Sequence, residues 1–134
     1  MIHPLTLAAA LTTATAALGG CTQSAEVTEK RDRIGYLGIQ TIVLDDDLVS
    51  FGVALQGARD KADVEAYGRC AAAQYALDQG YGFARQVRTI VKQNGRNWFG
   101  DAVYLISATQ PEGLRTVDAE AAVAACGELG IPTV

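Results

Sequence analysis

Histidine is nearly absent from this 134-residue sequence, whose single His is His3. Residues 4–134 carry no imidazole, which excludes Ser-His-Asp and Cys-His catalysis, and His-ligated zinc or copper, from that part of the chain. An active site there would need carboxylates, Lys, Tyr or a thiol. The sequence also lacks a pair of acids placed for hydrolysis. We therefore expect a protein without enzymatic activity, metal site or cofactor.

Charge is absent from the first 21 residues, which contain no Lys, Arg, Asp or Glu. The run from Leu5 to Leu18 consists of Leu, Ala and Thr. It has the length and character of a signal-peptide core and is too short to span a bilayer. Gly19 and Gly20 follow, and such small residues give a peptidase the uncrowded backbone that it needs. The segment therefore predicts export from the cytoplasm.

The four residues Leu18-Gly19-Gly20-Cys21 resemble the lipobox of bacterial lipoproteins. The resemblance implies cleavage between Gly20 and Cys21, a lipid group on the Cys21 sulfur, and acylation of the new amino group by a fatty acid such as palmitate. Two or more acyl chains are needed because a single chain gives only marginal, reversible membrane binding. The alternative is an ordinary secretory signal, in which Cys21 has no special role.

The resemblance divides the chain into a signal peptide at residues 1–20, a lipidated flexible tether at 21–32 and a single α+β domain at 33–134. It places the domain in the cell envelope, facing the periplasm. Thr22 follows the Cys where an Asp would favour the inner membrane, so the outer membrane is the expected location.

All 11 basic and 15 acidic residues lie after Cys21, so the net charge of −4 belongs to the exported part. This mild acidity argues against nucleic acid as a partner and against electrostatic adhesion to anionic lipid. No second apolar run reaches the length of a membrane helix. We expect the lipid on Cys21 to be the membrane anchor.

The hydrophobic pattern predicts two repeats of strand, strand, helix. Strands are expected at residues 34–44 and 48–55, joined by an Asp45–Asp47 turn, and at 82–92 and 98–109, joined by a turn over Gln93–Asn97 that contains an Asn-Gly pair. Helices are expected from Asp60 or Asp63 to Gln79 and at 117–129, the second capped by Thr116. The strand at 98–109 is apolar on both sides and should be central. We predict an α+β two-layer sandwich of the order ββαββα, with one antiparallel sheet and both helices on one face.

Cysteine is scarce beyond position 21, where the chain has Cys70 and Cys126. Each lies on the apolar side of a predicted helix. In an oxidising compartment, two thiols on helices that cover the same sheet face can form a disulfide, which is the pairing that we expect. The alternatives are two buried free thiols and, less consistent with their positions, a redox-active pair.

Other residues offer weaker candidates for a site. Arg88 and Lys92 should lie on one face of a predicted strand, with Arg85 on the opposite face, and could bind an anionic group; ordinary solvation of that face is the alternative. Asp101 is expected to pair with Arg85 or Arg88. The Asp45–Asp47 run is expected to be a solvated turn rather than a calcium site. The aromatic residues Trp98, Phe99 and Tyr104 are expected in core or edge positions, although Trp98 could instead be exposed to a partner.

Beyond the lipobox, the chain resembles the small, uncharacterised envelope lipoproteins of Gram-negative bacteria. We expect a lipid-anchored binding or adaptor module that recognises an envelope protein or glycan through the open sheet face or an edge strand. The alternative is a carboxylate-dependent enzyme, or an enzyme accessory, that acts on cell-wall or lipid material.

Overall fold

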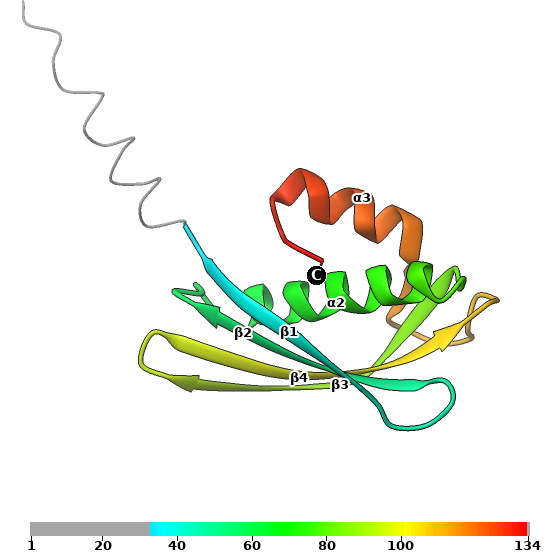
Figure 1. Cartoon of the computed structure of the whole chain (residues 1–134), viewed down its shortest axis with the longest axis horizontal. Helices are drawn as coiled ribbons and strands as arrows, with labels where there is room; N and C mark the ends of the chain where they lie inside the picture. Colours follow the sequence, from blue (N-terminus) through cyan, green and yellow to red (C-terminus); the bar gives the residue numbers. More distant parts are fainter. Residues whose placement is uncertain (1–32, 134) are drawn as a thin grey trace, which may run out of the picture. The chain divides into compact units, whose positions relative to one another are not determined.

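The computed structural model describes residues 33–133, in which strands and helices alternate as the sequence predicts (Figure 1). The strands are β1 (Gly35–Val43), β2 (Leu48–Gln56), β3 (Phe83–Asn94), β4 (Asn97–Ser107) and β5 (Thr116–Asp118), and the helices are α2 (Lys61–Asp78) and α3 (Ala119–Leu129). The predicted α+β fold with the order ββαββα is confirmed. The predicted signal peptide, the Gly20–Cys21 cleavage site and the tether lie outside the described residues.

The strands form one antiparallel sheet in the order β1-β2-β4-β3-β5. β4 lies at the centre, between β2 and β3, as its apolar sequence predicts. The β3–β4 hairpin turns through Gly95, whose φ of 61° is readily adopted by glycine, and Arg96. This Asn94-Gly95 turn pairs Asn94 with Asn97 and so determines the register of the two longest strands.

The short strand β5 was not predicted, and it displaces the start of the last helix. Thr116 was expected to cap that helix, but it lies in β5, opposite Arg85 of β3. The helix cap is Asp118, whose carboxylate accepts a hydrogen bond from the backbone N–H of Ala121 at 3.2 Å. The expected helix 117–129 therefore begins two residues later, at Ala119.

Both helices lie on the same side of the sheet, but they have different neighbours (Figure 1). α2 packs across β2, β3 and β4, whereas the main contacts of α3 are with α2 and β5. α2 begins at its cap residue Asp60 and is followed by Gly80, which has a φ of 81°. Both ends agree with the prediction from the sequence.

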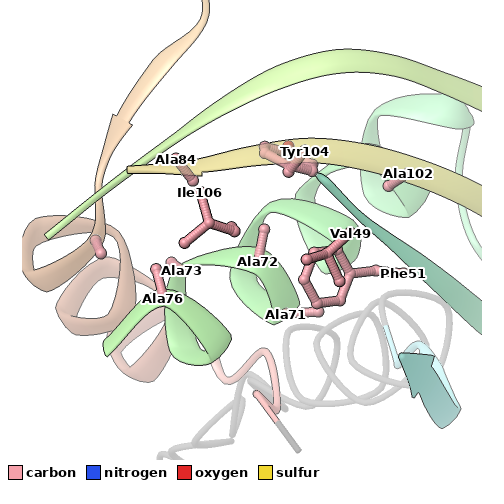
Figure 2. Packing of buried hydrophobic residues seen from close by; sticks show 11 residues of the cluster. Val49, Phe51, Ala71, Ala72, Ala73, Ala76, Ala84, Ala102, Tyr104 and Ile106 are labelled. Atoms are coloured by element: carbon pink, nitrogen blue, oxygen red, sulfur yellow. The ribbon is translucent and has the colours of Figure 1, made fainter. Parts of the chain in front are cut away.

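The core lies between α2 and the sheet and combines small helix residues with larger strand residues. Ala71, Ala72, Ala73 and Ala76 of α2 are buried, and Figure 2 shows them in the same cluster as Tyr104, Ile106, Val49 and Phe51 from the strands. The absence of large side chains on α2 permits a close approach of helix and sheet. Burial raises the pKa of Tyr104 to about 12, above the ordinary value of 10 for a tyrosine hydroxyl.

α3 is buried at two positions and exposed at its end. Ala119 and Cys126 are buried. The side chain of Leu129 is 67% exposed, because α3 ends there at Gly130 in the left-handed conformation. Within residues 33–133, no helix combines the length and the hydropathy needed to cross a membrane.

Candidate functional site: the open face of the sheet

The sheet has a face opposite the helices, which we call the open face. Residues directly opposite one another on antiparallel strands project to the same side, so the strand register identifies its members. They are Gly38, Gln40 and Ile42 of β1; Leu48, Ser50, Gly52 and Ala54 of β2; Phe99, Asp101, Val103, Leu105 and Ser107 of β4; and Phe83, Arg85, Arg88, Ile90 and Lys92 of β3. The alternate residues face the helices and are buried: Val49, Phe51, Val53 and Leu55 of β2, and Gly100, Ala102, Tyr104 and Ile106 of β4.

A β-bulge in β3 changes the face on which one of the cations lies. Strict alternation places Arg85 on the side opposite Arg88 and Lys92, and this expectation is wrong. The register shifts between Gln86 and Arg88, so that Arg85 lies opposite Leu105 and Arg88 opposite Val103. Because Val87 is the extra residue of the bulge, Arg85 lies on the open face together with Arg88 and Lys92. The predicted pairing of Arg88 and Lys92 on one face is correct.

Asp101 is the centre of a polar cluster on the open face. The Ser50 hydroxyl donates a hydrogen bond to Asp101 Oδ1 at 2.6 Å, and Arg88 Nη1 lies 3.1 Å from Asp101 Oδ2. The hydrogen bond from Ser50 is the largest cause that holds the pKa of Asp101 below its usual value; burial opposes it, and Arg88 adds to the lowering. The cross-strand pair expected for Asp101 is therefore formed with Arg88.

Phe99 lies between two hollows of the open face. One hollow, of about 530 Å³, is lined by β1, β2 and β4, with Gly38 and Gly52 among its lining residues. The other, of about 210 Å³, is lined by Ile90, Lys92 and Asp101 as well as by Phe99. Phe99 was expected in a core or edge position, but its side chain is 48% exposed. The sequence alone does not reveal this exposure, because Phe99 stands between Trp98 and Gly100 and its face follows only from the strand register.

The open face carries more positive than negative charge. Arg85, Arg88 and Lys92 lie on it together with one strand carboxylate, Asp101. Among the described residues, no carboxylate lies within ion-pair distance of Lys92. Arg85 reaches toward the loop before β5, where its Nη1 atom lies 3.6 Å from the position of a Cβ atom on Gly113, and its buried Nε has no hydrogen-bond partner in the described part of the chain.

These groups suit binding better than acid catalysis. A general acid needs a raised pKa to hold its proton at neutral pH, whereas the pKa of Asp101 is lowered. Residues 33–133 contain no group of three or more His, Cys, Asp or Glu side chains placed to share a metal ion. In the Asp45–Asp47 turn, Asp45 accepts a hydrogen bond from the backbone N–H of Asp46 at 2.8 Å, and all three acids are exposed.

Cys70 of α2 and Cys126 of α3 form a disulfide with an S–S distance of 2.02 Å. Both residues are buried. The bond joins the helix that lies on the sheet to the helix that packs beside it, and it lies on the side of the sheet away from the open face. It therefore supports the scaffold and contributes no group to the candidate site.

Comparison with known proteins places residues 36–130 in a family described as "YNQ4 C-terminal domain". The chain belongs to the YNQ4 C-terminal domain family. The match spans the sheet and both helices, and thus the whole open face.

The chain is similar to the "Uncharacterized 26.9 kDa protein in nqo8 5'region" of Paracoccus denitrificans, to which it is 34% identical over 88 residues. The aligned part covers 65% of this chain and 34% of the relative, so the chain spans about a third of the relative's length. No solved structure matches the chain. The comparisons identify the family and name no ligand or reaction.

Proposed function

We propose that this chain is a lipid-anchored, non-catalytic binding module of the cell envelope, whose open face docks an acidic, partly apolar segment of a partner protein. The observation that carries the proposal is the exposure of three apolar side chains on that face: Ile42, Ile90 and Phe99 are each 48% exposed. A sheet face that does not dock a partner is usually covered by polar residues, and a group of exposed apolar side chains is typical of an interaction surface.

Charge favours an acidic partner. The chain as a whole has a net charge of −4, yet the open face carries Arg85, Arg88 and Lys92 against Asp101. A cationic patch on an acidic protein attracts an anionic partner, and the acidic remainder of the surface repels that partner in other orientations. Lys92 borders the smaller hollow beside Phe99. A partner carboxylate can therefore bind Lys92 while a neighbouring apolar side chain packs against Phe99.

The Ser50–Asp101–Arg88 cluster gives this surface a fixed polar group. Arg88 bound to Asp101 presents its guanidinium in one orientation, so it loses less side-chain entropy on binding than a free arginine.

The lipid anchor is the part of the proposal that depends on the sequence alone. It follows from Leu18-Gly19-Gly20-Cys21 and would hold the module at the membrane.

Site-specific photocrosslinking in intact cells tests the docking surface. A photoreactive residue at position 90, on the open face, should give a discrete protein adduct, whereas one at position 120, exposed on α3, should give none. Lys92→Glu should reduce the position-90 adduct at least several-fold, since it reverses the charge beside Phe99. Lys61→Glu, at an exposed position of α2, is the matched control and should leave the adduct unchanged.

The proposal fails if position 90 gives no adduct, or if positions 90 and 120 give the same adducts. It also fails if Lys92→Glu and Lys61→Glu have equal effects, because the charge of the open face would then play no part in docking.

A further inference from the structure

The edge strand β1 differs from the strands that commonly end a sheet. Its nine residues, Gly35–Val43, contain no charged residue and no proline. It forms one end of the sheet order, and within the described residues no strand pairs with its outer side. At the opposite edge, the three-residue strand β5 pairs with Phe83–Arg85, and the rest of β3 carries the cations Arg88 and Lys92. Natural proteins usually guard an exposed edge with charges, prolines or short strands, and β1 has none of these along its second half.

The apolar side chains near the end of β1 are exposed. Ile42 is 48%, Val43 58% and Leu44 52% exposed. Pairing with another strand would cover part of these side chains and satisfy the outward-pointing backbone groups at the same time. A bulge between Tyr36 and Gly38 interrupts the start of β1, so the regular part available for pairing is Gly38–Val43.

We propose that β1 pairs antiparallel with β1 of a second copy of this chain, about a two-fold axis at Thr41. In that register Thr41 lies opposite Thr41 of the second copy, and Ile39 lies opposite Val43. Ile39 already packs against both core clusters, so the exposed Val43 of the second copy extends the core across the junction. Both sheets then share their open face and their helix face.

Charge complementarity favours a second copy over an unrelated strand. In that register Asp45 and Asp47 of each copy lie level with Leu37 and Gly35 of the other, and the exposed Arg33 stands two residues before Gly35. Each end of the paired strands thus has an acidic turn near a basic residue of the other copy, and the paired residues between them are uncharged. This inference does not rest on the proposed docking function of the open face.

Sedimentation velocity of the full chain carrying Cys21→Ser, which removes any lipid, tests the pairing at concentrations on the order of 100 µM. We expect a dimer. Thr41→Lys should sediment as a monomer, since the two-fold axis places the two lysines opposite each other, and Thr41→Glu should do the same. A mixture of equal amounts of the two variants should recover the dimer, because Lys then lies opposite Glu.

The recovery on mixing distinguishes loss of the interface from loss of the fold, and Thr41 is exposed, so the single chain tolerates either charge. Leu114→Lys, at an 87% exposed position far from β1 in the sequence, is the control and should remain dimeric. A monomeric parent chain, a Thr41→Lys variant that stays dimeric, or a mixture that stays monomeric would each overturn the proposal. A dimer that these variants leave intact would have to form through another surface.

Discussion

The Cγ1 atom of Val64 on α2 lies 2.5 Å from the position that a Cβ atom on Gly100 would occupy, and Val53 Cγ2 lies 3.0 Å from it. A glycine is therefore required at this point of β4, because any side chain would collide with the helix above it. The next residue on the same face, Ala102, has a similar relationship to the helix: a Cβ atom on Gly68 would lie 2.8 Å from Ala102 Cβ. The close approach of α2 to β4 depends on these small residues.

Gly100→Ala should lower the free energy of unfolding by about 1–3 kcal/mol, since overpacking forces the helix or the strand to move. Equilibrium unfolding in urea, monitored by circular dichroism, measures the change. Gly52→Ala is the matched control. It lies on the neighbouring strand but on the open face, where the nearest atom to a new Cβ is 3.7 Å away. We expect little change for Gly52→Ala; equal effects of the two variants would contradict the packing described for α2.

Reduction of the Cys70–Cys126 disulfide should lower the free energy of unfolding by about 4 kcal/mol, the chain-entropy value for closing a loop of this length. The two cysteines are 56 residues apart and join α2 to α3. Urea unfolding with and without reductant measures the loss. Counting thiols on the denatured, unreduced Cys21→Ser chain is the control and should find none. Two reactive thiols would show that the bond is absent from the protein.

Ser50→Ala should raise the pKa of Asp101, because the Ser50 hydroxyl is the largest cause of its lowering. Arg88→Gln should raise it less. NMR titration of the Asp101 carboxyl carbon measures both shifts. Ser107→Ala is the control, since the Ser107 hydroxyl donates to the Thr109 carbonyl oxygen and lies outside the Ser50–Asp101–Arg88 cluster. A larger shift for Arg88→Gln than for Ser50→Ala would contradict the order of these causes.

The same lowering gives Asp101 a small part in acid stability. Its folded-state pKa lies below the ordinary value of about 4, so the contribution is fully present above that pH and is lost as the pH falls through the lowered folded value. The Asp101 side chain is 46% exposed, which screens the pair and keeps its contribution below about 1 kcal/mol.

The fold class could be predicted from the sequence because its signals are local. Alternating apolar residues, the Asn94-Gly95 turn and the cap residue Asp60 each act within a few positions of the chain, and each was found where expected. The pairing of β2 with β4, on which the whole sheet depends, joins residues about fifty positions apart and leaves no such local signal.

The open face could be predicted only in part, for a similar reason. Arg88 and Lys92 were identified by simple alternation, and Arg85 was misplaced because a bulge adds one residue without changing the residue types around it. The exposure of Phe99 depends on which strand face the helices cover, and the hollow beside it depends on Gly38 and Gly52 from different strands. Neither can be deduced from one strand alone.

The most direct test of the proposed lipid-anchored module is the identity of its mature N-terminal residue. Mass spectrometry of the native protein from membrane fractions should find Cys21 as the first residue, carrying acyl groups, and a Cys21→Ser protein should no longer be retained in the membrane. Recovery of the native protein from the soluble cytosol with Met1 still in place would contradict the account.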